Sequence, residues 1–226
     1  MTNQTANLDW RGGVPIATAF DDPYYSLENG EEETEYVFLA GNDLPARFGG
    51  DFQIAELGFG TGLNLLVAWA AWDADGRRGA LRFTSFEAFP MATQDMQAAL
   101  AHFPQLARYA EILMNEWTPG SDPVQLSDGP LLEVVIGDAR KTVPGWAGMA
   151  DAWFLDGFSP AKNPELWDAD LLKAVGRHTK PDGTAATYSA AGQIRRSLQD
   201  AGFTVTRIPG YGRKRHMTIG RRAHAE

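Results

Sequence analysis

The sequence contains no cysteine and only four histidines among its 226 residues. The absence of cysteine excludes a disulfide framework, thiolate zinc sites, iron–sulfur clusters and a cysteine nucleophile. The histidines stand at positions 102, 178, 216 and 224 and form no His-x-x-x-His pair. We therefore expect a protein without a bound metal.

Long apolar runs are missing as well. No segment approaches the roughly 20 residues that cross a bilayer. The amino terminus, MTNQTANLDW, has neither the basic nor the apolar region of a signal peptide. Hydrophobic residues make up 44% and charged residues 22%, which is typical of a folded chain rather than a disordered or coiled-coil one. We expect a soluble, cytoplasmic protein with one domain.

Positive charge is scarce in the first part of the chain. Residues 1–60 hold 11 acidic and 2 basic side chains, which accounts for the net charge of -9, and the remaining residues balance at 18 and 18. Residues 192–222, by contrast, carry one acid and eight bases: Arg195, Arg196, Arg207, Arg213, Lys214, Arg215, Arg221 and Arg222. Such a basic segment attracts phosphates, although a solvated helix face followed by a charged tail would have the same composition.

Strand-like and helix-like segments alternate along the chain. Strands are predicted over residues 36–39, 52–57, 81–86, 131–136, 151–155, 184–188, 203–208 and 216–219. Helices are predicted over residues 64–72, 91–102, 106–113, 164–175 and 191–201. The alternation predicts an α/β fold with a mainly parallel seven-stranded sheet from residue 52 onward.

The two ends of the chain differ from this alternating core. The last two predicted strands have no helix between them, so they should pair antiparallel at the end of the sheet. Residues 1–35 form an irregular lead-in rich in Asp, Glu, Gly and Pro. We expect residues 1–50 to form an N-terminal extension, or lid, packed on a core of residues 51–222.

The main chemical signal is a glycine-rich turn between a predicted strand and a predicted helix, Glu56-Leu57-Gly58-Phe59-Gly60-Thr61-Gly62. Glycines at alternate positions allow a sharp turn and let a ligand lie against the backbone. The spacing G-x-G-x-G differs from the dinucleotide fingerprint G-x-G-x-x-G. A turn that merely closes a strand is the alternative.

Four carboxylates, Glu56, Glu87, Asp138 and Asp156, lie at or just beyond the ends of predicted strands. Ligands bind at this edge of an open α/β sheet. Converging carboxylates would repel a pyrophosphate, which argues against NAD, FAD and ATP. They suit S-adenosylmethionine, which carries an ammonium, a sulfonium, a ribose diol and an adenine amine.

Each carboxylate can be given a task on that ligand. We expect Glu87 to accept the ribose hydroxyls, Asp138, followed by Ala139, to accept from the adenine amine, and Glu56 to face the ammonium. Any one of them alone would also be explained as a solvated strand end or a helix cap.

Residues 151–164, DAWFLDGFSPAKNP, form the most distinctive segment. Asp156 is suited to orienting an acceptor amine, Phe158 to stacking on a planar base, and Lys162 to reaching a phosphate. Trp153 and Phe154 must share the two faces of a buried strand. A place in the core is the alternative for Phe158.

Several segments together carry a family resemblance. They are residues 20–26, 29–30 with 33–34 and 36–38, 56–64, 86–90, 151–164, 183–184 with 190–192 and 195–196, and 210–215. In this order they resemble the methyltransferase domain of the MnmC-type bifunctional tRNA-modifying proteins, which complete 5-methylaminomethyl-2-thiouridine at the wobble position, and its stand-alone homologues. The resemblance runs from about residue 10 to residue 220.

The resemblance implies a Rossmann-like class I methyltransferase that converts 5-aminomethyl(-2-thio)uridine in tRNA to the methylaminomethyl form. It implies cofactor-binding residues Glu56, Gly58, Phe59, Gly60, Thr61, Gly62, Asn64, Glu87, Asp138, Ala139 and Asp156. It implies catalytic residues Asp156 and Phe158, and tRNA-binding residues Lys162, Arg195, Arg196, Arg213, Lys214 and Arg215. For such a reaction Tyr24, Tyr25 or Tyr188 could assist Asp156.

The bifunctional relatives also carry an FAD-dependent oxidase domain, for which a chain ending at Glu226 has no room. We therefore expect only the methyl-transfer step here. A separate FAD oxidase is a candidate partner acting upstream.

Two other functions remain open on the sequence. The chain would also suit a methyltransferase acting on another RNA site or on a small amine. A non-catalytic protein that binds a nucleoside or RNA through the same fold is the alternative from a different class. The turn spacing and the carboxylates disfavour an NAD-linked oxidoreductase.

Overall fold

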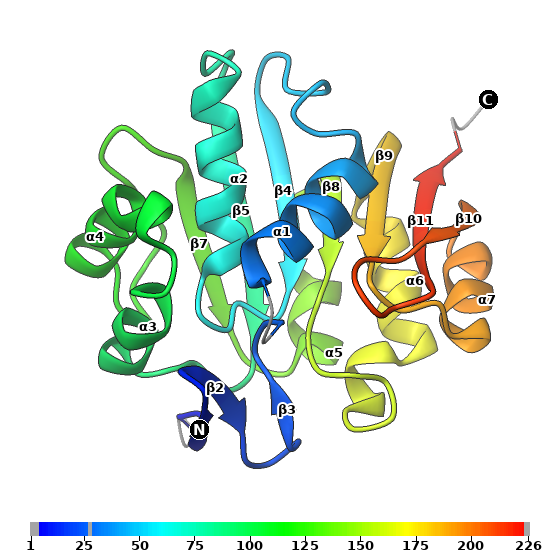
Figure 1. Ribbon diagram of the computed structural model, residues 1–226. Helices are drawn as coiled ribbons and strands as arrows, with labels where there is room; N and C mark the ends of the chain where they lie inside the picture. The colour runs from blue at the N-terminus through cyan, green and yellow to red at the C-terminus, as the bar shows by residue number, and fades with distance from the viewer. Residues whose placement is uncertain (1–4, 27–28, 224–226) are drawn as a thin grey trace.

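The computed structural model describes residues 5–26 and 29–223 (Figure 1). Within these residues an eight-stranded sheet has the order β10-β11-β9-β8-β4-β5-β7-β6. Its strands are β4 (Phe52–Leu57), β5 (Leu81–Glu87), β6 (Val124–Gln125), β7 (Leu131–Ile136), β8 (Ala150–Leu155), β9 (Thr179–Thr187), β10 (Phe203–Pro209) and β11 (His216–Arg222). The pairs among β4, β5, β7, β8 and β9 are parallel, and β11 runs antiparallel to both β9 and β10. The predicted α/β, Rossmann-like sheet with an antiparallel last strand is confirmed.

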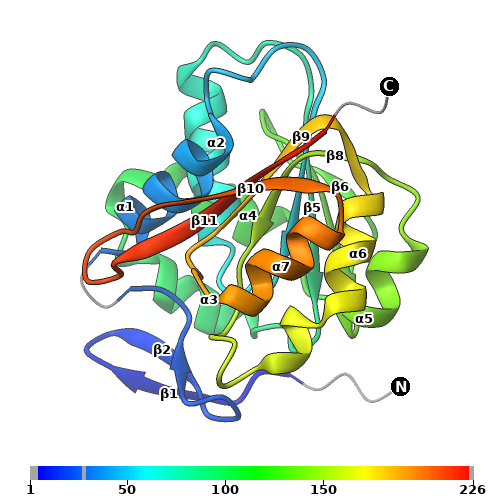
Figure 2. The ribbon, with the colours of Figure 1, turned by 90° about the vertical axis from the view of Figure 1, so that its right-hand side faces the viewer.

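Helices cover both faces of this sheet. They are α1 (Gly30–Thr34), α2 (Leu63–Ala74), α3 (Thr93–Leu100), α4 (Ala107–Glu116), α5 (Ala139–Thr142), α6 (Ala169–Arg177) and α7 (Gly192–Asp200). Figure 2 shows α5, α6 and α7 on one face and α1 to α4 on the other. None of the helices in the described part of the chain is long and apolar enough to span a membrane.

Alternating side chains of the central strands fill the two layers of core. Ile54 and Phe154 pack in the cluster on the α2 side, whereas Ala55 and Trp153 pack in the cluster on the α6 side. All four are fully buried. A strand buried on both faces favours apolar residues at consecutive positions, and these fill most of β4 and β8, with Gln53, Glu56 and Asp151 as the polar exceptions. Trp153 and Phe154 do share the two faces of their strand.

The strand order creates a switch point beside β4. The chain proceeds outward from β4 to β5 and β7, then returns to place β8 on the other side of β4. The loops after β4 and β8 therefore diverge, and the crevice between them is where open α/β sheets bind ligands.

The prediction of a strand over residues 36–39 is wrong. These residues belong to a π-helical turn, Glu35–Leu39, that continues α1. Asn29 caps α1 by accepting from the amide of Glu32, and glutamates occupy the first turn, where negative charge is favourable. The run Val37-Phe38-Leu39 is buried from this helical turn, so tertiary packing overrides its β-branched and aromatic composition.

The prediction of an irregular lead-in over residues 1–35 is also wrong for most of the described part. A three-stranded antiparallel sheet forms from β1 (Leu8–Arg11), β2 (Val14–Ala17) and β3 (Asp22–Pro23), and α1 follows it. Residues 1–4 of the predicted extension lie outside the described residues. The small sheet lies beyond the carboxyl ends of the central strands (Figure 1), and Tyr25 ties this region to α3 through its hydroxyl, 3.2 Å from the carbonyl oxygen of Ala99.

Two smaller corrections concern the core. The single helix predicted over residues 164–175 is a 3₁₀ turn, Pro164–Trp167, followed by α6, because Asp168 caps α6 by accepting from the amides of Asp170 and Leu171. The sheet gains an eighth strand, β6, whose two residues are too few to give a sequence pattern.

Candidate active site

A cavity of about 730 Å³ opens at the carboxyl ends of the central strands. It is bordered by the loops after β4, β5, β7 and β8, by the N-terminal segment and by the loop between β10 and β11. Predicted site residues that line it are Gly58, Phe59, Gly60, Thr61, Asn64, Glu87, Asp138, Ala139, Asp156, Phe158, Arg213 and Lys214. Its size is in the usual range for a small-molecule site.

The glycine-rich turn forms the floor of this cavity. Gly58, Gly60 and Gly62 have φ of 83°, 53° and 82°, a region that L side chains rarely adopt. Glu87, at the end of β5, holds the turn in place: its Oε2 accepts from the amide of Gly60 at 3.0 Å, and its Oε1 accepts from the amide of Phe89 at 2.8 Å. The turn and this carboxylate are thus joined directly.

Asn64 links two carboxylates beneath and beside the cavity. Its Nδ2 lies 2.8 Å from Oε1 of Glu56 and 2.7 Å from Oδ2 of Asp156. Its Oδ1 accepts from the Thr34 hydroxyl at 2.8 Å. Glu56 also accepts from the Ser85 hydroxyl at 2.6 Å, and only 1% of Glu56 is exposed. Glu56 therefore lies under the cavity wall rather than lining it, whereas Asp156 faces the cavity.

Burial dominates the electrostatics of both acids. It raises the pKa of Asp156 to about 6, against the hydrogen bonds from Asn64 and the amide of Gly157 that favour the carboxylate. Burial raises the pKa of Glu56 well above its ordinary value, partly offset by the hydrogen bonds from Ser85 and Asn64. A group titrating near neutral pH in a cavity is a common property of functional sites.

Phe158, which follows β8, lies in an aromatic cluster with the N-terminal segment. Its ring stacks on Phe20 with centroids 4.7 Å apart and meets Tyr24 edge-on at 5.1 Å. Asp22 accepts from the amide of Ser159 at 2.8 Å. The N-terminal segment therefore holds the loop that carries Asp156 and Phe158.

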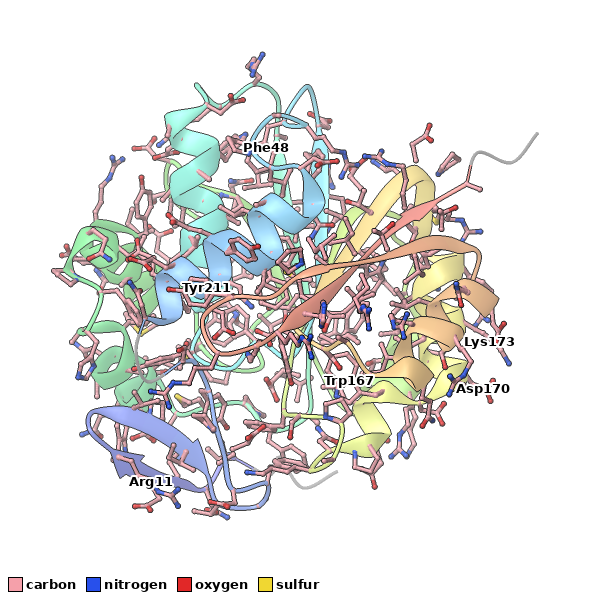
Figure 3. All side chains as sticks on the ribbon, turned by 45° about the vertical axis from the view of Figure 1, so that its right-hand side comes forward. Arg11, Phe48, Trp167, Asp170, Lys173 and Tyr211 are labelled. Carbon is pink, nitrogen blue, oxygen red and sulfur yellow. The ribbon has the colours of Figure 1, made fainter. Side chains whose placement is uncertain are left out.

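The loop of residues 210–215, which joins β10 to β11, contacts α1 across the cavity mouth. Lys214 pairs with Glu33, and its Nζ lies 4.1 Å from the centroid of the Tyr188 ring. Tyr211 donates to Glu32 at 2.6 Å and lies beside α1 in Figure 3. The hydroxyl of Tyr188 donates to the carbonyl oxygen of Gly157 at 2.8 Å. Tyr188 therefore contacts both the loop 210–215, through Lys214, and the loop after β8, through Gly157.

Asp138 is both a cavity residue and a helix cap, the two roles expected from its position at a strand end. It lines the cavity, and it also caps α5 by accepting from the amide of Arg140 at 3.0 Å. The Arg140 guanidinium lies 2.8 Å from Oδ2 of Asp138 and holds the pKa of this carboxyl below its ordinary value. A ligand amine at Asp138 would therefore share the carboxylate with Arg140.

The remaining predicted residues lie outside the cavity lining. Gly62 is buried below the turn, next to Leu113 and Phe59. Lys162 contacts the N-terminal segment, with its Nζ 3.3 Å from Oδ1 of Asp22. Arg195 and Arg196 lie on α7, and Arg215 is exposed in the loop between β10 and β11.

Several residues that border this cavity have no role in the prediction from sequence. Phe20, Glu33, Thr34 and Arg140 line it. The segments containing Phe20, Glu33 and Thr34 are visible as motifs, but nothing local indicates that they reach the carboxyl ends of β4 and β8. The three tyrosines considered as assistants, Tyr24, Tyr25 and Tyr188, line it as well.

The residues present fit S-adenosylmethionine. Carboxylates at three strand ends supply acceptors for hydroxyl and amine groups and a negative field for a sulfonium. The turn leaves backbone exposed where a side chain would intrude: a Cβ on Gly60 would lie 3.0 Å from Cδ1 of Tyr24. In the described part of the chain no group of three or more His, Asp or Glu side chains is arranged to hold a metal ion.

The chain is similar to several proteins of known structure. The structure is similar to that of MNMC2 from Aquifex aeolicus, with a TM-score of 0.74 and 26% identity over 99% of this chain and 73% of that chain. Weaker similarities are to a methyltransferase from Pyrococcus furiosus (TM-score 0.49, 16% identity, 91% of this chain and 90% of that chain) and to the aminopentose methyltransferase CalS10 from Micromonospora echinaspora (TM-score 0.48, 13% identity, 85% and 91%). The model of a family described as S-adenosyl-L-methionine-dependent methyltransferase matches residues 104–223, which is more than half of the chain. The protein is thus a member of the family of S-adenosyl-L-methionine-dependent methyltransferases.

Proposed function

We propose that the protein methylates the primary amine of 5-aminomethyl(-2-thio)uridine at the wobble position of tRNA, giving 5-methylaminomethyl(-2-thio)uridine. The motif resemblance and the likeness to MNMC2 along 99% of the chain support this substrate. The observation that carries the proposal is the Asp156 carboxylate facing the cavity, with Phe158 on the same loop and the glycine-rich turn in the same lining. This arrangement gives an amine acceptor, a stacking surface and a cofactor site in one cavity.

The cofactor, when bound, supplies a methyl group activated by a sulfonium. We assign its site to Gly58, Phe59, Gly60, Thr61, Gly62, Asn64, Glu87, Asp138, Ala139 and Asp156, with Glu56 supporting them from beneath. Glu87 is already bound to the turn through the amide of Gly60, so its carboxylate position is fixed before a ligand arrives.

The chemical difficulty lies with the substrate amine. An alkylammonium has a pKa of about 10, so holding the amine neutral at pH 7 costs about 4 kcal/mol. Asp156, with a pKa of about 6, is mostly ionised at pH 7, and its Oδ1 and Oδ2 each keep a lone pair for an amine N–H. The amine must lose a proton before it attacks the methyl group, and the ionised Asp156 carboxylate beside it is the acceptor that we assign to this proton. In-line positioning supplies much of the remaining acceleration.

Phe158 is assigned to the uracil ring. Aromatic side chains bind unstacked RNA bases by stacking on them. Phe20 already stacks on one side of Phe158, so the base would contact the remaining surface of the ring or take the place of Phe20.

The tRNA itself is assigned to a set of basic side chains, of which Arg213 and Lys214 line the cavity. Lys162, Arg195, Arg196, Arg213, Lys214 and Arg215 are the predicted contacts. We add Arg207 and His216. In the pair of β10 and β11, Arg207 lies opposite Thr218, two positions from His216, and burial together with the charges of Arg207, Arg215 and Arg195 lowers the pKa of His216. A cytoplasmic location and an upstream FAD oxidase that supplies the aminomethyl group belong to the same proposal.

The test uses the purified protein, labelled S-adenosylmethionine and two tRNA samples, one carrying 5-aminomethyl-2-thiouridine and one lacking the aminomethyl group. We expect label in methylaminomethyl uridine from the first sample alone. Label in another nucleoside or in a small amine would replace the proposed substrate. Cofactor binding without any transfer would mean a non-catalytic binding protein. In Asp156→Asn we expect retained cofactor binding and a loss of transfer of at least about 100-fold.

A further inference from the structure

The fold places one residue of the N-terminal extension behind the proposed catalytic machinery. Thr34, the last residue of α1, is 4% exposed, and its hydroxyl donates to Oδ1 of Asn64 at 2.8 Å. Asn64 is 8% exposed and occupies the second position of α2. The two helices meet through this hydrogen bond, next to the end of β4.

The three hydrogen bonds of Asn64 use both of its N–H donors and one lone pair of Oδ1. A primary amide has two N–H donors on Nδ2 and an acceptor on Oδ1. The two donors go to Glu56 at 2.8 Å and Asp156 at 2.7 Å, and the acceptor goes to Thr34. The reversed orientation would place Oδ1 against the Asp156 carboxylate, and Nδ2 would take the place of the acceptor for the Thr34 hydroxyl.

The Thr34 hydroxyl is the group that satisfies Oδ1 in this buried place. Without it Oδ1 would be a buried acceptor with no partner, and such a group is driven to turn toward water. The route to water leads toward the cavity, which Asn64 borders. That rotation would withdraw the Nδ2 donor from Asp156.

Asp156 depends on this donor because its surroundings oppose ionisation. Burial opposes its ionisation most, and Glu33 on α1 and Glu56 on β4 are acidic neighbours. Tyr188 after β9 is a weak acid bound to Gly157, whereas the charge of Lys214 in the loop 210–215 favours the carboxylate. The hydrogen bonds that favour its carboxylate form come from Asn64 and from the amide of Gly157 at 2.7 Å. Without the hydrogen bond from Asn64, burial would raise the pKa of Asp156 further.

We propose that Thr34 is a positioning residue, whose hydroxyl fixes the Asn64 amide so that Asp156 remains an ionised, correctly oriented acceptor for the substrate amine. The inference rests on the proposed function, in which Asp156 binds that amine. It makes α1 part of the catalytic apparatus. It also explains why the Thr34 side chain, at the junction of α1 and the π-helical turn, is polar although it is buried.

The experiment compares Thr34→Val, which keeps the shape and removes the hydroxyl, with Thr34→Ser, which keeps the hydroxyl. In Thr34→Val we expect the pKa of Asp156, followed by carbon-13 NMR in the protein without cofactor, to rise by about one unit, since a hydrogen bond to the charged form is removed. In the pH profile of the single-turnover rate with aminomethylated tRNA, the acidic limb should move to higher pH by the same amount. Cofactor affinity is measured for both variants so that the rates are compared at saturating cofactor, and Thr34→Ser should behave as the parent protein. A parental pKa and rate profile in Thr34→Val would overturn the inference.

Two controls keep the outcome decisive. If Thr34→Val is unfolded at the assay temperature, Thr34→Ala replaces it, because alanine likewise has no side-chain donor. The same displaced titration is expected, and a parental one overturns the inference. Asp156→Asn separates the two proposals. If Asp156→Asn transfers methyl groups at the parental rate, the proposed role of Asp156 is wrong and the inference loses its basis. If Asp156→Asn is inactive but Thr34→Val keeps the parental pKa and rate profile, only the role of Thr34 is overturned.

Discussion

Gly60 shows how one residue sets the shape of the cofactor cavity. Its φ is 53°, its amide donates to Glu87, and a Cβ at this position would lie 3.0 Å from the Tyr24 ring. A side chain here therefore meets backbone strain and a close neighbour at once. Gly76 has a φ of 88°, but no atom lies within 4 Å of a Cβ built on it. A side chain at Gly76 would therefore introduce backbone strain without a close neighbour.

We expect Gly60→Ala to lower the affinity for S-adenosylmethionine at least about tenfold, because the turn or Tyr24 must shift. Gly76→Ala should lose about 1 kcal/mol of stability from strain and keep its affinity. Isothermal calorimetry and thermal unfolding measure the two effects. Equal cofactor affinity in the two variants would contradict a role of Gly60 in shaping the site.

Glu56 is a buried acid whose ionisation opposes folding. Its folded-state pKa is raised well above its ordinary value, so the native protein binds this proton more tightly than the unfolded chain does. The free energy of unfolding therefore falls as the pH rises from the unfolded value near about 4.3 toward the folded one. The hydrogen bonds from Ser85 and Asn64 stabilise the ionised form of Glu56 and partly offset this effect.

We expect Glu56→Gln to flatten the dependence of stability on pH above the unfolded value of about 4.3, because the folded-state pKa of Glu56 is raised by burial. The slope removed is at most about 1.4 kcal/mol per pH unit, the value for one proton. Denaturant unfolding of the two proteins at several pH values measures it. Parallel curves would show that Glu56 does not titrate in this range.

At the scale of secondary-structure elements, the N-terminal sheet and α1 complete a cavity that the Rossmann-like core leaves open. Phe20 stacks on Phe158, Asp22 accepts from the Ser159 amide, and Thr34 binds Asn64. On this basis we propose that the described part of the extension serves as a lid. The loop 210–215 meets the same region from the other side through its contacts with Glu32 and Glu33.

We expect Phe20→Ala to lower kcat/KM for aminomethylated tRNA about tenfold, the effect of losing an aromatic pair worth up to about 1.5 kcal/mol. Trp10→Ala is the matched control, because Trp10 lies on β1 of the same small sheet and is 38% exposed. Steady-state rates and melting temperatures are compared for both variants. The lid role of Phe20 fails if both variants turn over equally.

At the scale of the whole molecule, charge is unevenly distributed along the chain. The net charge is -9, yet the segment holding α7, β10 and β11 is basic. Lys214 and Lys162, predicted as phosphate contacts, instead pair with acids of the N-terminal segment, Glu33 and Asp22. We therefore assign phosphate binding mainly to the arginines around His216, namely Arg195, Arg207 and Arg215.

We expect replacement of Arg195, Arg207 and Arg215 by Gln to weaken tRNA binding and to reduce its salt slope by about one for each phosphate that these side chains neutralise. Replacement of Arg78, Arg82 and Arg108 by Gln changes the net charge equally at positions after α2, on β5 and on α4. Binding titrations at several salt concentrations distinguish a local effect from a global charge effect. The same weakening in both triple variants would assign the effect to net charge.

Much of the fold and of the site follows from local order along the chain. Strand and helix periodicity predicts the α/β core, and the glycine spacing with the acids at strand ends locates the cavity, because parallel strands bring their carboxyl ends to one edge. The partners of these side chains depend instead on packing between distant elements. Residues 36–39 form a helical turn because the burial of Val37, Phe38 and Leu39 outweighs their strand propensity, and Glu56 lies beneath Asn64 instead of lining the cavity. Thr34 reaches Asn64 from 30 positions away, a pairing that no pattern of neighbouring residues records.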